Sequence, residues 1–444
     1  MFNFDGSVAV VGAGPAGLAV AAELLDQGFN VVVYERHSEV GGVWDTENPG
    51  SPMYQSAHLI SSRDRSAFRG FAMPADFPDY PTRNQQLTYL RDFARAKNLY
   101  AHIRFGAEVT CVDRAADAGW ALTFRDNSRE TVDALVIANG HLWQPRLPDY
   151  PGDFAGTTLH AVDYRSREQF EGHRVLIVGG GNSAVDIACD AAISAESATI
   201  SMRRGYHFVP KHMFGIPTDV FGHGRLPLST AMRQRVFGAL VRLLVGDLQR
   251  FGVQKPDHPI MASHPIMNSQ ITHHLRHGDI TAAPDVAYLR GDTVHFVDGS
   301  CDEFDMIVWA TGYQPTIPFI AAEHLPSRAG APDLFLRLMH RDYDDLFVAG
   351  LFEVDSSVNP TLSRQGRLIA AALRAACDCQ AAELKSLKRS DLELLGNVRH
   401  VDTERHSIYI QEEAYRQAAR RTLERLRVMA SRCDCHVQAV GAAL

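Results

Sequence analysis

Two glycine-rich turns hold the residues whose types and spacing point most directly to chemistry. Gly12–Gly17 has the spacing G-x-G-x-x-G and is followed further on by Glu35. Gly179–Ala184 has the spacing G-x-G-x-x-A and is followed by Arg203 and Arg204. Such turns bring backbone N–H groups close to a pyrophosphate. An acid beyond the turn binds the ribose hydroxyls, whereas arginines in the place of the acid favour a ribose with a 2′-phosphate. The two turns therefore predict two different dinucleotide sites, the second for NADP, with pairing to nearby carboxylates as the alternative role of the arginines.

Apolar runs and helix-forming stretches on either side of the turns would hold them in place. Around the first turn, Val8–Val11 and Val31–Tyr34 are predicted strands, with a predicted helix over Leu18–Gln27 between them. Around the second turn, Arg174–Val178 is a predicted strand and Ala184–Ile193 a predicted helix. Each helix would direct its N-terminal N–H groups and the positive end of its dipole at the phosphates. Both segments therefore belong to predicted βαβ units.

Composition bounds the class of protein. The 444 residues, 45% of them hydrophobic, are enough for two or three globular domains. A net charge of −8 argues against nucleic acid as a partner, because the charges would repel. No apolar stretch is typical of an export signal or a membrane span, and the seven cysteines are scattered, so we expect a cytoplasmic protein.

We expect an α/β fold with two Rossmann-like dinucleotide-binding domains, the second inserted in the first. The predicted limits are 1–165 for the first part of the first domain, 166–303 for the second domain, and 304–444 for the return to the first domain with C-terminal helices. The insertion is inferred because Phe304–Ala310 is a predicted strand that leads back to the first unit. Within the second domain, about residues 228–278 are expected to form a helical insertion.

A helix predicted over Ala231–Phe251 belongs to this insertion and carries one broad apolar stripe. The stripe consists of Met232, Val236, Leu240, Leu244, Leu248 and Phe251. Arginines flank it, which would suit contact with a membrane surface. Packing against the core, or against a second subunit in a homodimer, is the commoner use of such a stripe.

Four histidines in the same region, His264, His273, His274 and His277, resemble a metal cluster by number alone. His273 and His274 are adjacent, so their side chains would face apart on a helix. No cysteine or acid completes a ligand set with them in the sequence pattern. We therefore expect no metal.

The segment Phe154–Tyr164, just before the second glycine turn, matches F-x-G-x-x-x-H-x-x-x-Y. In this it resembles the fingerprint of the flavin-containing monooxygenases, here of the bacterial type within the class B flavoprotein monooxygenases. The resemblance covers most of the chain, because besides both glycine turns it includes Gly42–Trp44, Phe77–Leu99 and Ala310–Tyr313.

The resemblance implies FAD at the first turn and NADPH at the second. The FAD site would consist of Gly12, Ala13, Gly14, Pro15, Ala16, Gly17, Glu35, Arg36, Gly42, Val43, Trp44 and Val109. The NADPH site would consist of Gly179, Gly181, Asn182, Ser183, Arg203 and Arg204. In such enzymes NADPH reduces the flavin, O2 adds to form a C4a-hydroperoxyflavin, and one oxygen atom passes to nitrogen or sulfur of a small organic substrate such as N,N-dimethylaniline. The cofactor carries this chemistry, so few catalytic side chains are needed.

One position departs from the family pattern. Ile60 falls where an asparagine commonly faces the flavin and oxygen, and isoleucine cannot hydrogen-bond a peroxide. His58 and Ser61 are our candidate catalytic substitutes, with packing of the loop as their alternative role. His160 and Tyr164 are expected to shape the hinge between the domains and the nicotinamide site.

Three other functions fit parts of the sequence. Baeyer–Villiger oxygenation of a ketone uses the same fold, but that family's similar fingerprint ends in tryptophan followed by proline or aspartate, where this chain has Tyr164-Arg165. A pyridine-nucleotide disulfide reductase would need a cysteine pair beside the flavin, and no cysteine occurs before Cys111. An uncoupled NADPH oxidase, or a flavin- and NADPH-binding sensor, would follow if Ile60 abolished oxygenation.

Overall fold

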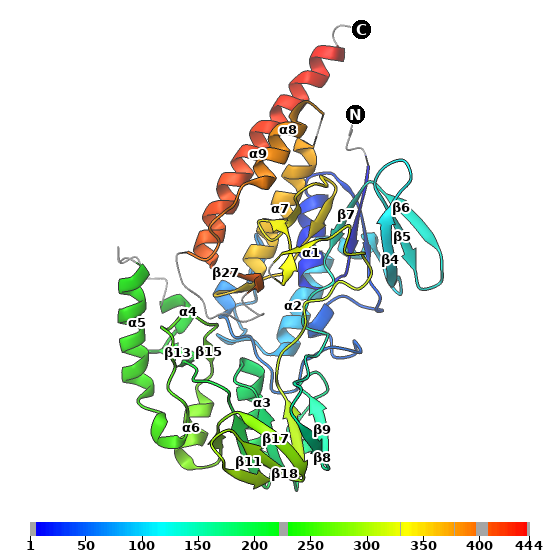
Figure 1. Cartoon of the computed structure of the whole chain (residues 1–444). Coiled ribbons are helices and arrows are strands. Elements are labelled where there is room, and N and C mark those ends of the chain that lie inside the picture. The colour runs from blue at the N-terminus through cyan, green and yellow to red at the C-terminus, as the bar shows by residue number, and fades with distance from the viewer. Residues whose placement is uncertain (1–5, 222–229, 329, 377, 397–406, 442–444) are drawn as a thin grey trace.

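The fold contains two open sheets of mainly parallel strands, and each carries one of the glycine turns (Figure 1). In the chain, the strands of the second sheet are inserted between those of the first. The computed structural model describes residues 6–221, 230–328, 330–376, 378–396 and 407–441. The first sheet lies with α1 and α7 in the upper part of Figure 1, and the second lies with α3 in the lower part. The α/β class and the two Rossmann-like units predicted from the sequence are confirmed.

The first sheet has seven strands in the order β23-β24-β25-β7-β1-β2-β3. They are β1 (Ser7–Val11), β2 (Asn30–Tyr34), β3 (Ile103–Arg104), β7 (Ala134–Ile137), β23 (Leu334–Phe335), β24 (Met339–His340) and β25 (Leu346–Val348). The neighbouring strands from β25 to β3 pair in parallel. Val8 and Val10 of the central strand β1 are fully buried, as expected where both faces of a parallel sheet are covered.

Two helices that are far apart in sequence pack closely beside the first sheet. They are α1 (Pro15–Leu25), which follows the first glycine turn, and α7 (Asn359–Ala375). Where they meet, a Cβ atom added to Gly366 would lie 2.9 Å from the Cβ of Glu23 and 3.1 Å from the Cα of Val20. The long helix α9 (Glu412–Gly441) packs on α7 in turn and extends beyond the sheet (Figure 1).

The second sheet has five parallel strands in the order β16-β11-β10-β20-β9. They are β9 (Thr157–His160), β10 (Arg174–Val178), β11 (Ser197–Ser201), β16 (Thr281–Ala283) and β20 (Met306–Trp309). The second glycine turn joins β10 to α3 (Asn182–Ser194). Helix α6 (Gln270–His277) packs against α3.

We had expected the strand around residues 304–310 to return the chain to the first unit. It does not. β20 is instead an interior strand of the second sheet, because its four buried residues pair with β10 on one side and β9 on the other. The chain rejoins the first sheet only at β23. The exact limits of the domains stay a prediction, but limits that keep both sheets whole assign β9 and β20 to the second domain.

Smaller elements complete the two units. A four-stranded sheet contains β8 (Gly152–Phe154), β17 (Val286–Gly291), β18 (Thr293–Phe296) and β19 (Cys301–Glu303), and a three-stranded sheet contains β4 (Val109–Arg114), β5 (Trp120–Phe124) and β6 (Arg129–Val132). The strand pairs are β12 (Phe208–Val209) with β15 (Ile266–Met267), β13 (His212–Met213) with β14 (Ile216–Pro217), β21 (Ser327–Arg328) with β22 (Ala331–Pro332), and β26 (Glu353–Val354) with β27 (Tyr409–Ile410). The remaining α-helices of the described residues are α2 (Arg83–Ala96), α4 (Thr218–Phe221), α5 (Thr230–Val245) and α8 (Ala381–Arg389).

Helix α5 is shorter than the helix predicted to run to Phe251. It ends because Gly246 adopts a left-handed conformation, with a φ of 74°, and donates its N–H to the carbonyl of Arg242. The predicted stripe is divided: Leu248 is buried in the core of the second domain, whereas Val236 remains 52% exposed. Residues 228 and 229 of the predicted insertion lie outside the described part of the chain. Among the described helices, none combines the length and the apolar character needed to cross a bilayer.

We expect Gly366→Val to destabilise the protein by about 1–3 kcal/mol, because a side chain forced into a close helix contact shifts the backbone. Gly238→Val is the matched control, since it also adds a side chain to a helical glycine, but its Cβ would meet only the side chain of Ile260 at 3.3 Å. Chemical denaturation of both variants measures the difference. Equal stability of the two would contradict the close contact between α1 and α7.

Candidate functional site

The first glycine turn is held in a shape that only glycine allows. Gly12 has a φ of 109° and donates its N–H to the carbonyl of Tyr34 over 2.8 Å. A Cβ on Gly17 would lie 1.8 Å from the carbonyl oxygen of Gly12, so helix α1 touches the strand-to-helix turn. Gly14 is the N-cap of α1, and no side chain caps the helix there. The first-turn N–H groups are therefore free to bind an anion.

The second glycine pair, at the start of the short 3₁₀ helix η1 (Gly42–Trp44), lies directly on this turn. Gly41 donates its N–H to the carbonyl of Ala13 over 3.1 Å, and a Cβ on Gly42 would lie 2.8 Å from the Cα of Gly14. The two backbone segments are thus in contact. Trp44 is half-buried at the end of the segment. The contact of Gly42, Val43 and Trp44 with FAD stays a prediction.

Glu35 is fixed beside the first turn by two backbone hydrogen bonds. Its Oε2 accepts the N–H of Ala13 over 2.6 Å and its Oε1 accepts the N–H of His37 over 2.9 Å. The side chain is buried at the end of β2. Each carboxylate oxygen can accept a further hydrogen bond, so the group can bind ribose hydroxyls next to a pyrophosphate at Gly14. These residues therefore fit an adenine dinucleotide.

The other candidate residues of the first site lie around this group. Pro15 and Ala16 form the first turn of α1, and Val109 is buried at the start of β4. The guanidinium of Arg36 lies 5.6 Å from the ring centroid of Trp143. Their assignment to the cofactor stays a prediction.

The second glycine turn has two crowded positions and one open position. A Cβ on Gly179 would lie 2.3 Å from the carbonyl oxygen of Ala310, and a Cβ on Gly180 would lie 2.1 Å from the ring of Tyr206. At Gly181, the N-cap of α3, no atom would lie within 4 Å of an added Cβ. A phosphate can therefore approach the N-terminus of α3 at Gly181.

Asn182 serves the fold rather than presenting its side chain to this open position. Its Oδ1 accepts the N–H of Met267 over 2.8 Å, and its Nδ2 lies 3.4 Å from the carbonyl oxygen of Pro265. The amide thus ties the strand β15 to the start of α3. Any contact of Asn182 with a cofactor through the present conformation would be made by its backbone N–H.

Arg203 and Arg204 differ in their surroundings. Arg203 is exposed just beyond β11, and the guanidinium of Arg204 lies 5.4 Å from the ring centroid of Tyr206. Neither arginine takes part in an ion pair between residues that the structure describes. The pairing with carboxylates that we considered as their alternative role is not found there, and Arg203 is free to bind a phosphate.

Two carboxylates on α3 hold the loop that contains Tyr54 and Ser56. The hydroxyl of Tyr54 donates to Asp186 Oδ2 over 2.9 Å, and the hydroxyl of Ser56 donates to Asp190 Oδ2 over 2.5 Å. Tyr164, the last residue of the fingerprint, donates to the same Oδ2 of Asp190 over 2.9 Å. Loop, fingerprint and helix α3 are therefore joined through two acids one helical turn apart.

Asp186 and Asp190 were not among the residues predicted from the sequence. Asn268 adds a further contact, since its Nδ2 donates to Asp186 Oδ1 over 2.7 Å. Removal from water raises the pKa of Asp186, and the same burial raises the pKa of Tyr54 well above its usual value. The sequence does contain a sign of this pair. The two acids are four residues apart in a mainly apolar helix, which places both on one face.

His160 closes the other connection between the domains. Its Nδ1 accepts the N–H of Val162 over 3.1 Å, so the neutral ring carries its proton on Nε2, which donates to the carbonyl of Gly312 over 3.1 Å. Burial lowers the pKa of His160 and so favours this neutral form. A hinge role of His160 and Tyr164 is consistent with these contacts.

The two candidate catalytic side chains make local hydrogen bonds. His58 is exposed and its Nδ1 donates to the carbonyl of Ser56 over 2.7 Å, which leaves Nε2 as an acceptor. The hydroxyls of Ser61 and Ser66 are 2.8 Å apart. Ile60 is half-buried and packs against the core of the second domain. Their roles in catalysis stay predictions.

With this geometry in place, comparison with known proteins decides the family. The model of the flavin-binding monooxygenase-like family matches residues 5–407. The chain belongs to this family. Among curated proteins, the dimethylaniline monooxygenase [N-oxide-forming] 2 of Rattus norvegicus is 29% identical over 396 residues, which cover 83% of this chain and 74% of the relative.

Two solved structures of low sequence identity share the fold of this chain. The S-allyl-L-cysteine S-oxygenase of Allium sativum has a TM-score of 0.65 and 20% identity, and the alignment covers 96% of this chain and 88% of the other. The OTEMO complex with FAD and NADP has a TM-score of 0.70 and 17% identity, with 95% and 98% of the two chains covered. The resemblance inferred from the fingerprint is thus confirmed.

We expect Gly181→Val to raise KM for NADPH by at least about tenfold, because the side chain would occupy the open position while the fold has room for it. Gly179→Val is the contrasting variant, since its Cβ collides with the backbone of Ala310 and should lower the melting temperature as well. Steady-state kinetics and thermal unfolding of both variants measure these effects. An unchanged KM in a folded Gly181→Val protein would argue against phosphate binding there.

Proposed function

We propose that this flavin-binding monooxygenase transfers one oxygen atom from O2 to a nitrogen or sulfur atom of a small organic substrate. The observation that carries the proposal is the pair of glycine turns with opposite charges beyond them, Glu35 after the first and Arg203 after the second. FAD at the first and NADPH at the second supply a complete route for electrons to O2. The name of the rat relative, which describes N-oxide formation, favours nitrogen as an acceptor atom.

The residues of this chain would bind and orient the two cofactors. The backbone N–H groups at the start of α1, beside Gly14, would bind the FAD pyrophosphate, and Glu35 would accept hydrogen bonds from its ribose. Gly181 and Arg203 would hold the pyrophosphate and the 2′-phosphate of NADPH. Reduced flavin, once bound, supplies the electrons that activate O2.

The loop from Tyr54 to Ser61 is the proposed wall between cofactors and solvent. Its hydrogen bonds to Asp186 and Asp190 fix it to the helix whose N-terminus would bind NADPH. His58 and Ser61 remain our candidates for hydrogen bonding near the flavin, because they lie on this loop. The apolar Ile60 would exclude water there.

A cytoplasmic location and a homodimer are proposed on separate grounds. The cysteines Cys111, Cys189 and Cys301 are free thiols, as is usual in a reducing compartment. Met232, Val236 and Leu243 of α5 are exposed apolar side chains of a kind that a second subunit would cover.

We expect Arg203→Ala to raise KM for NADPH by about tenfold or more and KM for NADH by less than about twofold, because only NADPH has the charged 2′-phosphate. Arg290→Ala, which removes an exposed arginine from β17, is the control and should change neither value. Initial rates with both nucleotides give the comparison. Equal changes for the two nucleotides with Arg203→Ala would remove the argument for 2′-phosphate recognition.

The substrate class is tested with N,N-dimethylaniline, a dialkyl sulfide and a cyclic ketone, each incubated with NADPH and O2. We expect an N-oxide or a sulfoxide, detected by mass spectrometry, together with substrate-dependent NADPH consumption. Formation of an ester from the ketone alone would replace the proposal by Baeyer–Villiger oxygenation. Hydrogen peroxide as the sole product in all three reactions would indicate an uncoupled oxidase.

A further inference from the structure

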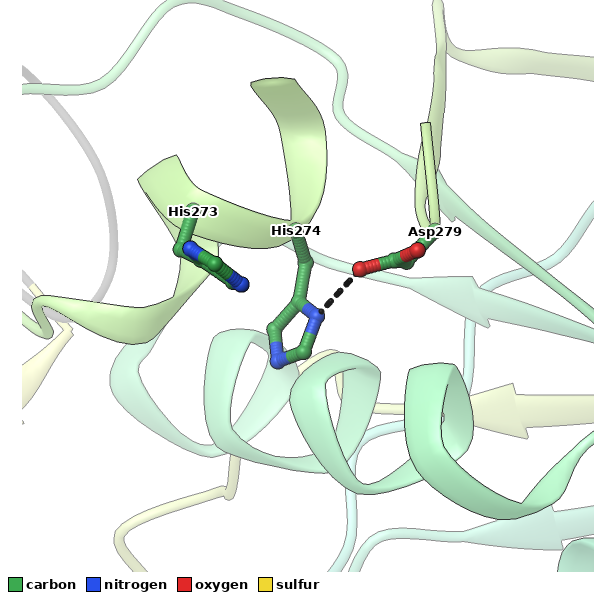
Figure 2. A group of neighbouring side chains, drawn as sticks. All are labelled: His273, His274 and Asp279. Atoms are coloured by element: carbon green, nitrogen blue, oxygen red, sulfur yellow. Dashed lines mark hydrogen bonds and ion pairs between the residues drawn. The ribbon is translucent and has the colours of Figure 1, made fainter. Parts of the chain in front are cut away.

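Three ionisable side chains converge at the C-terminal end of α6, outside the two glycine turns (Figure 2). They are His273, His274 and Asp279, and one ligand atom of each lies within 4.8 Å of the corresponding atoms of the other two. His274 Nδ1 is 3.0 Å from Asp279 Oδ2. Figure 2 shows the His273 ring extending from the same turn of helix toward His274. The group is open to solvent, with His274 15% and Asp279 42% exposed.

The end of the helix brings these residues together. Ile271 and Leu275 are buried and fix the inner face of α6, while His273 is exposed and the side chain of His274 is mostly buried. Gly278 then adopts a left-handed conformation with a φ of 81°, and Asp279 donates its N–H to the carbonyl of His274 over 3.0 Å. The chain thereby folds back and places the carboxylate beside the imidazole.

This geometry corrects the reasoning that led us to expect no metal. Adjacent histidines were expected to face apart, but the ring centroids of His273 and His274 are only 5.3 Å apart. An acid was expected to be missing, but Asp279 supplies one from beyond the helix. Spacing within the helix could not reveal a ligand that reaches the histidines through the turn after Gly278.

A His–Asp ion pair alone does not account for the whole group. The pair uses His274 and Asp279, whereas His273 makes no hydrogen bond or ion pair with the described residues and so keeps its imidazole nitrogens available. His277, one turn further along α6, lies against His273 with ring centroids 4.1 Å apart. Several imidazoles beside one carboxylate favour a bound cation over protonated rings, which would repel one another.

We propose that His273, His274 and Asp279 form a binding site for a divalent transition metal of the Zn²⁺ class. Two imidazoles and one carboxylate suit Zn²⁺, with water completing the shell, whereas Mg²⁺ and Ca²⁺ select oxygen ligands. On binding, the metal takes the place of the proton between His274 Nδ1 and Asp279, and the neutral ring then carries its one proton on Nε2. The metal would link the last turn of α6 to the segment that follows it.

The consequence would be stabilisation of the helix that supports the loop network. The residue before the N-cap of α6 is Asn268, whose side chain donates to Asp186 and accepts the N–H groups of Gln270 and Ile271. A ligand that binds only the folded helix end raises the apparent stability of the protein by mass action. This inference does not depend on the oxygenation reaction.

The test uses untagged, flavin-loaded full-length protein and Zn²⁺ alone. Isothermal titration should show binding at neutral pH, and Asp279→Asn and His273→Gln should each weaken it by at least about tenfold. Asp113→Asn is the matched control, because Asp113 pairs with His324 over 2.8 Å, but no three ligand atoms of the described residues come mutually close there. Its Zn²⁺ affinity should equal that of the unchanged protein.

Two further readouts separate this site from binding of Zn²⁺ to exposed thiols. Anomalous scattering at the zinc edge should place the metal at the end of α6 in crystals soaked with Zn²⁺. Binding should also weaken in acid, because protons compete with the metal for the imidazole nitrogens. Equal affinities of Asp279→Asn, Asp113→Asn and the unchanged protein, or no measurable Zn²⁺ binding, would overturn the proposal.

Discussion

Contact between backbone segments at the glycine turns is the constraint on which the rest of the structure depends. At the first turn, Gly17 meets the carbonyl of Gly12, and Gly42 meets the Cα of Gly14, at distances that no side chain could share. A strand end, a helix N-terminus and a second turn therefore meet at one point and direct N–H groups into it. A phosphate site made of backbone N–H groups needs no particular side chains. Glycines are therefore the main residues by which such a site can be recognised in a sequence.

Helix α3 would link the two cofactor sites. Its N-terminus begins at the second glycine turn, and its Asp186 and Asp190 bind the loop that contains Tyr54. Its N-terminus at Gly181 would bind the nicotinamide nucleotide, while Asp186 and Asp190 hold the loop on the flavin side and the fingerprint residue Tyr164. Hydrogen bonds to carboxylates are strong where water is partly excluded. Movement of the helix relative to the loop would break several of them at once, so a nucleotide bound at Gly181 and the loop near the flavin should keep one relative position.

Features set by neighbouring residues could be predicted from the sequence. Features that depend on contacts between segments far apart in the sequence could not. The turn at Gly12 and the burial of β1 follow from residues a few positions apart. The placement of β20 in the second sheet does not, because a short apolar strand can pair equally well in either sheet until its neighbours are known. The same limit concealed the use of the Asn182 amide by β15, which is a contact between residues far apart in sequence.

The loop around Ile60 shows how little the protein itself needs to contribute to oxygen transfer. Isoleucine offers no hydrogen bond, and His58 Nδ1 and the Ser61 hydroxyl are engaged with Ser56 and Ser66. The cofactor would carry the reaction, so the remaining requirements are a fixed geometry and the absence of water. The loop meets the first requirement through its bonds to α3, and Ile60 can meet the second because it packs against the apolar core of the second domain. Replacement of the family's asparagine is therefore compatible with oxygenation if exclusion of water, rather than a hydrogen bond at this position, protects the oxygen site.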